Sequence, residues 1–265
     1  MTQSADRPHQ PRDTLSQRRI DGVYIQSGTA ERLMVRVRGT AARWTSEQLR
    51  AVSSLAARFG DGSVHITTRG DLELHGVDQS NLDTLLAHLA ATGLATRGAC
   101  GDTVRNVTAC AGSGICPHER LDAGSFAAEI ARAFTCSPAY ERLPRKFKIS
   151  VSGCERACAL PLIQDIGIVA EPRRRTETSE GAGFRIYLAG GLGRHPALGK
   201  KMPDLVTPTG LIPFVRAALD CYNELGDRAH RHRGRMKFLA EALGPQGLLT
   251  TILERLETAA WSYEI

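Results

Sequence analysis

Aromatic residues are scarce in this chain. Phe, Trp and Tyr make up 5% of its 265 residues, although the formal net charge is +6 and the pI is about 9.1. The few aromatic side chains do not alternate with the basic ones, as they would on a surface that stacks nucleic-acid bases. No nucleic-acid-binding module is recognisable either. The positive charge therefore favours small anions or an anionic cofactor as ligands, and no nucleic acid.

Long apolar stretches are also missing. No segment approaches the ~20 apolar residues of a membrane span, and residues 1–19 are polar, unlike a signal peptide. We therefore expect a cytoplasmic protein without a membrane segment. In that reducing compartment, paired cysteines bind metal more often than they form disulfides.

Four of the seven cysteines form two short pairs. Cys110 and Cys116 enclose five residues that include Gly112 and Gly114, and Cys154 and Cys158 enclose three. Two such pairs, brought together by the fold, can hold one cubane iron–sulfur cluster through four thiolates. A zinc ribbon would favour gaps of two to four residues in both pairs. The spacing predicts an iron–sulfur cluster, and a zinc site or ordinary buried thiols are the alternatives.

Basic residues recur at the ends and on the faces of expected strands. Lys146 and Lys148 are two residues apart, so they point the same way on a strand, and Pro144 precedes them at its entrance. Convergent cations beside a metal cluster suit the reduction of an anion. The set comprises Arg36, Arg38, Arg69, Arg105, Arg145, Lys146 and Lys148.

Hydrophobic periodicity predicts an α+β chain in two parts. The order strand, helix, strand, strand, helix indicates a ferredoxin-like α/β sandwich over residues 20–98, after a disordered tail over 1–19. The second part, 99–265, is expected to hold the cysteines in an α+β domain that ends in helices. Its expected strands cover 147–152, 165–170 and 184–189, and its last three helices cover 211–225, 227–243 and 246–259.

Several stretches resemble the sirohaem-dependent nitrite and sulfite reductase family. The most specific are the run Pro144-Arg145-Lys146-Phe147-Lys148 and the spacing of the cysteines around Val151-Ser152-Gly153-Cys154-Glu155-Arg156-Ala157-Cys158. Shorter likenesses cover His65–Arg69, Gly101–Val107 and Gly234–Leu239, so that the resemblance extends over about residues 20–260.

The resemblance implies two cofactors and a role for each candidate residue. In the family, a 4Fe-4S cluster shares one cysteine thiolate with the iron of sirohaem, and that cysteine matches Cys158. The cluster ligands would be Cys110, Cys116, Cys154 and Cys158. The motif match places Arg38, Arg105, Lys146 and Lys148 at the substrate, and Arg36, Arg69 and Arg145 at the carboxylates of the macrocycle.

The implied activity is the six-electron reduction of sulfite to sulfide or of nitrite to ammonia, without a choice between the two. The chain shows no flavin or nicotinamide module, so an external ferredoxin or flavoprotein would supply the electrons.

Typical members have two repeats, with the cysteines in one and most substrate cations in the other, whereas this single repeat carries both. A homodimer is therefore expected, in which the cysteines of one subunit face the cations of the other. The alternatives are a precorrin-3B synthase-like tetrapyrrole enzyme and a non-catalytic iron–sulfur electron-transfer subunit.

Overall fold

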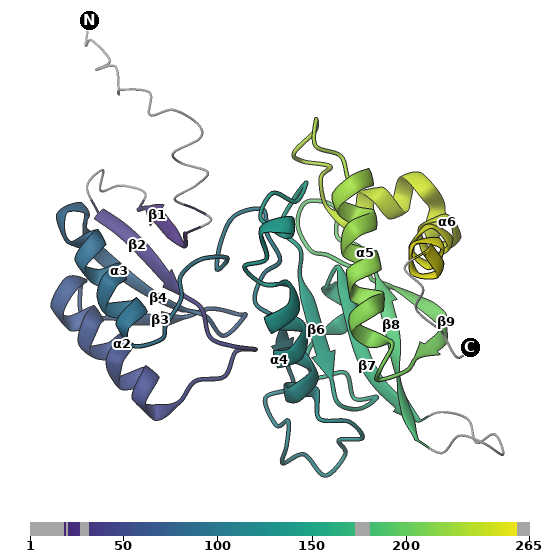
Figure 1. Ribbon diagram of the computed structural model, residues 1–265, viewed down its shortest axis with the longest axis horizontal. Helices are drawn as coiled ribbons and strands as arrows, with labels where there is room; N and C mark the ends of the chain where they lie inside the picture. Colours follow the sequence, from purple (N-terminus) through teal and green to yellow (C-terminus); the bar gives the residue numbers. More distant parts are fainter. Residues whose placement is uncertain (1–18, 20, 27–31, 173–180, 259–265) are drawn as a thin grey trace, which may run out of the picture.

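The computed structural model describes residues 19, 21–26, 32–172 and 181–258. These residues form two sheets, and each sheet has its own cluster of buried apolar side chains (Figure 1). The tail expected over residues 1–19 lies outside the described residues, apart from Arg19. The division between residues 98 and 99 stays a prediction.

The first sheet is antiparallel and has the strand order β1-β2-β4-β3. Alternate residues of β2 (Leu33, Val35 and Val37) are buried under the helices, because successive side chains of a strand point to opposite faces. The first helix begins with the expected capping box, in which Thr45 and Gln48 exchange hydrogen bonds. The elements are β1 (Val23–Ile25), β2 (Arg32–Val37), α2 (Ser46–Phe59), β3 (Val64–Ile66), β4 (Leu72–Asp78), η1 (Gln79–Asn81) and α3 (Leu82–Ala91).

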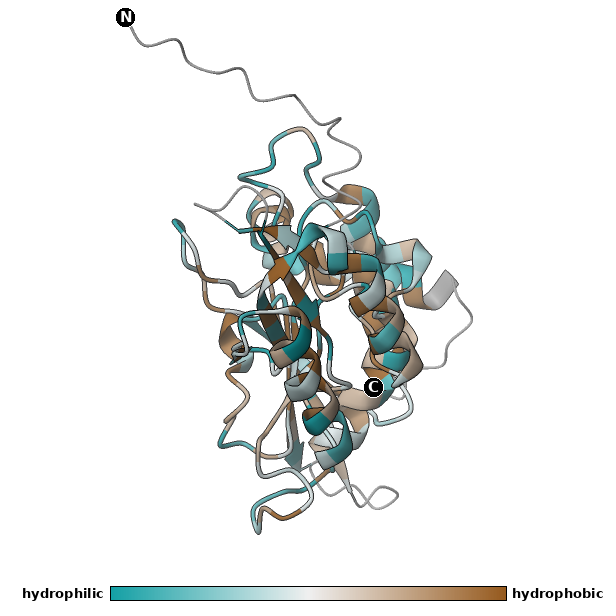
Figure 2. Ribbon diagram, turned by 90° about the vertical axis from the view of Figure 1, so that its left-hand side faces the viewer, coloured by the Kyte–Doolittle hydropathy of each residue, from teal (hydrophilic) through white to brown (hydrophobic). Residues whose placement is uncertain are grey.

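This arrangement confirms the ferredoxin-like α+β prediction for the first part of the chain. In Figure 2, which looks onto this side of the molecule, hydrophilic and hydrophobic segments alternate along the helices. Such amphipathic helices bury one stripe against a sheet and leave the other to solvent.

The second sheet has the strand order β5-β6-β7-β8-β9. The first three strands are parallel, and the last two pair antiparallel. Helix α4 packs on β5 and β6, and α5 packs against α4 and α6. The elements are β5 (Thr108–Ala109), α4 (Ala123–Phe134), η2 (Pro138–Tyr140), β6 (Ile149–Ser152), η3 (Pro161–Ile163), β7 (Ile166–Pro172), β8 (Ala182–Leu188), β9 (Lys200–Val206), α5 (Leu211–Leu225) and α6 (Met236–Thr258).

The C-terminal helices correct one expectation. The helix predicted from residue 227 begins only at Met236, and residues 227–235 form turns. The expected break before residue 246 is present, since Gly244 has a φ of 73° and Pro245 follows it within α6. Strand β9 was not predicted, because its charged residues and Pro203 are typical of a sheet edge and hide the alternation of a strand.

Candidate functional site

Both cysteine pairs begin where parallel strands end. Strand β5 runs directly into Cys110, and β6 leads through Gly153 into Cys154. Ala109 and Val151 are register partners, so the two loops leave the same edge of the sheet side by side. The Cys110 Sγ lies 3.9 Å from the carbonyl oxygen of Val151. The fold therefore brings the two cysteine loops together.

A short segment after the first loop fastens it to the second. The backbone N–H of Arg120 donates to the carbonyl of Gly153 at 2.7 Å, and its guanidinium pairs with Glu155 at 2.9 Å. The carboxylate of Glu119 accepts the N–H of Gly114, and a side chain at Gly153 would overlap this carboxylate. Protein contacts alone thus hold the two loops against each other.

The four thiols are free and differ in their exposure. Cys154 is buried, Cys110 and Cys116 are half-buried, and Cys158 is exposed. No three of these sulfurs lie within 4.8 Å of one another in the described chain. A tetrahedral zinc ion with Zn–S bonds near 2.3 Å would hold its four sulfurs about 3.8 Å apart. The sulfurs therefore do not form such a tetrahedron, and the preference for an iron–sulfur cluster rests on the gaps of five and three residues within the pairs.

The opposite end of β6 carries the cations. The N–H of Arg105 donates to the carbonyl of Phe147 at 2.8 Å, so Arg105 lies beside the segment that contains Lys146 and Lys148. Lys148 and Gly153 are five residues apart, roughly 16 Å along an extended strand. Arg105, Lys146 and Lys148 therefore gather at the far end of the strand from the cysteines, whereas Arg38 contacts Thr135 at the end of α4.

Burial and neighbouring charges weaken proton binding by both lysines. Burial lowers the pKa of Lys148 to about 8, and repulsion from Arg69 and Arg235 adds to the effect. The pKa of Lys146 is also lowered, first by burial and then by Arg105. With a pKa of about 8, Lys148 can hold or release a proton near neutrality.

A buried carboxylate fixes the position of one of these lysines. Asp165 is fully buried and accepts the backbone N–H of Lys148 at 2.8 Å. The same carboxylate accepts two hydrogen bonds from Arg235, at 2.9 and 3.2 Å. Charge-assisted bonds of this kind restrict both partners to one geometry. Asp165 thus orients an arginine and the lysine backbone together.

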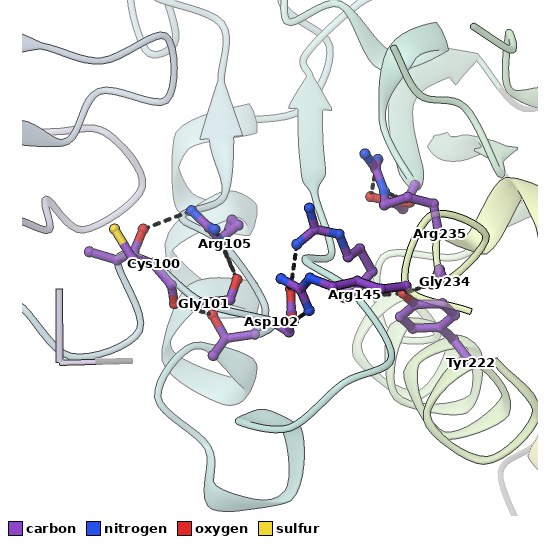
Figure 3. Close-up of polar contacts among 12 residues, drawn as sticks. Cys100, Gly101, Asp102, Arg105, Arg145, Tyr222, Gly234 and Arg235 are labelled. Carbon is purple, nitrogen blue, oxygen red and sulfur yellow. Dashed lines mark hydrogen bonds and ion pairs between the residues drawn. The ribbon is translucent and has the colours of Figure 1, made fainter. Parts of the chain in front are cut away.

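A second carboxylate orders the arginines near the turn over residues 227–235 (Figure 3). Asp102 accepts from Arg145 at 2.8 Å and also from Arg231. Burial acts to raise the pKa of Asp102, but these two arginines hold it below its usual value. The hydroxyl of Tyr222 donates to the carbonyls of Gly234 and Arg145, which ties the turn to the strand entrance.

The cations line a cleft of about 510 Å³. The loop after β8 forms one wall, and it is held by Lys237, whose ammonium group donates to the carbonyls of Gly191 and Leu192 at 3.4 Å and to that of His195. The lining residues are Arg145, Lys146, Lys148, Leu192, Gly193, Arg194, His195, Arg231, His232, Arg235, Lys237 and Phe238.

Only three of the twelve residues that line the cleft, Arg145, Lys146 and Lys148, are among the candidates that the sequence predicts. The helix expected over 227–243 includes Arg231, His232 and Arg235, whereas the structure places them in the turn before α6, where they line the cleft. The Gly234–Leu239 likeness contains Arg235, Lys237 and Phe238, so it could have indicated this wall of the cleft. Arg194 and His195 follow directly after the glycine-rich turn over residues 190–193.

Two arginines of the first sheet already have protein partners. Arg36 donates to Glu73 at 2.9 Å through Nε, and its guanidinium lies over the ring of Tyr24. Arg38 donates to Thr135, while its Nε is buried and has no partner among the described residues. Arg36 is therefore largely neutralised, whereas Arg38 keeps a buried N–H donor, at Nε, for a ligand.

Arg69 joins the two sheets. It is 9% exposed and donates to the carbonyls of Asn106 and Ile149 at 2.8 and 2.6 Å, and to the side chain of Gln164 at 2.9 Å. Burial lowers its pKa to about 10. Through these hydrogen bonds, the guanidinium of Arg69 holds the two parts of the chain together.

Arg105 is also held by its own loop. Its guanidinium donates to the carbonyls of Gly101, at 2.9 and 3.1 Å, and Ala99, at 3.0 Å (Figure 3). The bonds fix the charge next to Lys146 without neutralising it, because carbonyl oxygens carry no net charge.

A group of histidine and carboxylate side chains lies on the first sheet. The ligand atoms of His65, Glu73 and His75 are within 4.8 Å of one another. A continuous chain of contacts satisfies this group: the N–H of Gly76 donates to Gln26, whose amide lies 3.0 Å from His75 Nδ1, and His75 Nε2 lies 3.2 Å from Glu73. This arrangement places the His75 proton on Nε2, so no metal site is assigned here.

Comparison with known proteins agrees with this geometry. Residues 100–259 match the family described as the nitrite and sulphite reductase 4Fe-4S domain, and residues 25–92 match the nitrite/sulfite reductase ferredoxin-like half domain. The chain belongs to the nitrite and sulphite reductase family. Among the described residues, no helix combines the length and apolarity needed to cross a membrane.

The curated relatives are roughly twice as long as this chain. An assimilatory ferredoxin-dependent nitrite reductase of Haloferax mediterranei is 30% identical over 258 residues, which cover 92% of this chain and 43% of the relative. A sulfite reductase [NADPH] hemoprotein beta-component of Chromohalobacter salexigens is 28% identical, with 94% and 47% covered. The solved structure of Mycobacterium tuberculosis NirA shares the fold, with a TM-score of 0.81 and 24% identity over 94% of this chain and 47% of that one.

Family membership indicates a 4Fe-4S cluster and sirohaem as the cofactors. The residues present fit both groups. Soft thiolates on two adjoining loops suit an iron–sulfur cluster. The cationic cleft suits the carboxylates of a macrocycle, and the unpartnered Nε of Arg38 is a donor that a carboxylate could accept.

Proposed function

We propose that this chain is the catalytic part of an oxidoreductase that reduces a small oxyanion by six electrons, sulfite to sulfide or nitrite to ammonia. The observation that carries the proposal is the placement of four free thiols on adjoining loops, together with a cationic cleft on the same sheet. The nitrite and sulfite reductases among its relatives support the same class of reaction.

Each candidate residue keeps the role that its place allows. Cys110, Cys116, Cys154 and Cys158 are the proposed cluster ligands, and the exposed thiol of Cys158 is the one that a second cofactor can reach. The bound cofactors would supply the electrons and the iron that holds the anion. Arg38, Arg105, Lys146 and Lys148 are the proposed substrate cations, and Arg36, Arg69 and Arg145 the proposed macrocycle contacts. The internal bonds of Arg36 and Arg69 make those two the weakest members of the set.

The lysines have two proposed tasks. Their charge attracts the oxyanion and stabilises the negative charge that develops on its oxygens. Because its pKa is about 8, Lys148 can also give up a proton when an oxygen leaves as water. Asp165 keeps the Lys148 backbone in place throughout.

The test is to remove each ammonium group and measure cofactor content and turnover together. Lys146→Ala and Lys148→Ala should keep cluster and sirohaem and lose most sulfite and nitrite turnover, while Lys201→Ala on the exposed edge strand should behave as the wild type. Full activity in either cleft variant would refute the assigned role. A cluster without sirohaem in the wild type would point to the electron-transfer subunit instead, and turnover of a precorrin without oxyanion reduction to the tetrapyrrole enzyme.

The assembly is part of the proposal. The chain spans less than half the length of several relatives, and its thiols and cations lie at opposite ends of β6. A homodimer would let the cysteines of one subunit face the cations of the other, in the cytoplasm, with a ferredoxin or flavoprotein as electron donor. Co-expressed Cys158→Ser and Lys148→Ala chains, each inactive alone, should then regain up to about a quarter of wild-type activity, because random pairing gives half mixed dimers with one intact site. A mixture that stays inactive would contradict the shared site.

A further inference from the structure

Arg43 reaches from the first part of the chain to the first cysteine loop. Its Nη2 donates to the carbonyl of Ser113 at 3.3 Å and lies 4.0 Å from the carboxylate of Asp122. Ser113 stands midway between Cys110 and Cys116. A guanidinium group therefore touches the loop that carries two of the four thiols.

The backbone that presents Arg43 adopts an unfavourable conformation. Ala41 and Ala42 have φ angles of 51° and 62°, in the left-handed region that residues with a Cβ avoid. Ala42 is accommodated only because its neighbour Gly70 has no side chain, which would overlap it. Strain of this kind persists where the surroundings fix it, and it is found preferentially at functional sites.

The amino end of the helix that Arg43 touches is an unfavourable place for a cation. The guanidinium lies against Gly124 in the first turn of α4, where any side chain would overlap it. The amino end of a helix carries a positive partial charge, so a cation there is unfavourable. Asp122 caps this helix by accepting the N–H groups of Gly124 and Ser125 at 3.0 and 3.2 Å. The contacts that hold Arg43 at this place are therefore the carbonyl of Ser113 and the carboxylate of Asp122.

The loop itself is surrounded by negative charge. The hydroxyl of Ser113 contacts the carboxylates of Glu119 and Asp122 at 2.6 and 2.9 Å. Hydrogen bonds, first from Ser125 and then from Ser113, lower the pKa of Asp122 to about 2, so this carboxylate is ionised at neutral pH. A thiolate-bound cluster is itself anionic, and each added electron makes it more so. Carboxylates beside the loop oppose that electron, and a cation favours it.

We propose that Arg43 sets the reduction potential of the cluster by holding a positive charge against the Cys110–Cys116 loop. The inference rests on the proposed assignment of the four cysteines as cluster ligands. Its sign follows from electrostatics: the cation stabilises the reduced, more negative cluster and so raises the potential. The step concerned is the uptake of one electron from the external donor, in which no bond is made or broken.

The experiment is a redox titration of the anaerobically purified holoprotein, followed by electron paramagnetic resonance. Arg43→Gln should lower the ratio of reduced to oxidised cluster about two- to fivefold at a fixed potential, since the group is 54% exposed and partly screened. Fivefold corresponds to about 40 mV for a one-electron couple, at 59 mV per tenfold. Asp122→Ser keeps a capping side chain but removes the negative charge, and should shift the ratio by a similar factor in the opposite direction.

Two further variants separate charge from structure. Arg43→Lys should stay near the wild type, and Arg50→Gln, at an exposed position of α2, should not change the potential. The resonance reports only clusters that are present, so a lower cluster content does not hide the result. An unchanged potential in Arg43→Gln, or shifts of the same sign in Arg43→Gln and Asp122→Ser, would overturn the proposal. If Arg43→Gln kept no cluster, the Asp122→Ser variant would decide: a higher ratio of reduced to oxidised cluster would support the proposal, and a lower ratio would overturn it. A wild type without any cluster would instead refute the cysteine assignment.

Discussion

The two ends of strand β6 carry different kinds of side chain. At the carboxyl end, thiols and glycines lie on loops that hydrogen bonds hold together, and Glu119 packs directly against Gly153. At the amino end, cations crowd around a cleft, and the fully buried Asp165 orders them. The difference between the two ends shows that roughly one strand length separates the proposed cluster ligands from the proposed substrate cations.

Cysteine substitution should have the largest effect, and only on the carboxyl end. Cys154→Ser removes a proposed ligand, so we expect loss of nearly all cluster absorbance and iron, because three thiolates hold a cubane poorly. Cys221→Ala, in the buried face of α5, should retain the cluster at a modest cost in stability. Iron and acid-labile sulfide per chain are the measurements. A full cluster in Cys154→Ser would remove this thiol from the ligand set.

Breaking the buried pair at the amino end should cost the most stability. Asp165→Asn leaves the guanidinium of Arg235, whose side chain is 11% exposed, without a counter-charge. We expect the free energy of unfolding to fall by about 3 kcal/mol. The control Glu241→Gln breaks an exposed pair with Arg233 and should cost less than about 0.5 kcal/mol. Equal costs in a denaturant titration would mean that the buried pair is not a structural support.

Packing at the carboxyl end should be sensitive at one glycine and tolerant at another. A Cβ at Gly153 would overlap Glu119 and approach the carbonyl of Leu121, so Gly153→Ala should cost about 1–3 kcal/mol. A Cβ at Gly112 would meet only Cys116, at an ordinary 3.6 Å, and Gly112→Ala should change stability by less than about 0.5 kcal/mol. Thermal unfolding of the two variants measures the contrast, and a tolerated Gly153→Ala would show that the loops are not tightly joined.

The smallest effect is expected in the pH dependence of anion binding. Burial lowers the pKa of Lys148 from 10.5 to about 8, so the side chain is charged below pH 8 and neutral above it. Nitrite affinity should therefore fall by up to about tenfold as the pH rises through about 8. Lys148→Arg keeps its charge and should flatten the profile. Spectral titration with nitrite at several pH values is the measurement, and parallel profiles for both proteins would assign the titration to another group.

Local patterns in the sequence were sufficient for much of the fold. The order of elements in the first part and the helix over 211–225 depend on local hydrophobic periodicity, and the structure confirms both. Strand β9 and the late start of α6 were missed because an edge strand and a turn are defined by tertiary contacts.

The candidate site divides in the same way. The cysteine spacing and the two lysines stand in short motifs, so the sequence alone pointed to both ends of β6. The contacts of Arg36 with Glu73, and of Arg69 with Asn106 and Gln164, join residues that are 37 to 95 positions apart. No local pattern reports such distant partners. The walls of the cleft were not predicted for the same reason, because they come from two distant segments, the loop after β8 and the turn before α6.

The most direct test of the central claim is a metal and sulfide analysis of the anaerobically purified wild type, combined with electron paramagnetic resonance after reduction. The account predicts about five irons per chain, four in the cluster and one in sirohaem, and about four acid-labile sulfides, with the signal of a reduced 4Fe-4S cluster. Stoichiometric zinc without sulfide or signal would contradict it.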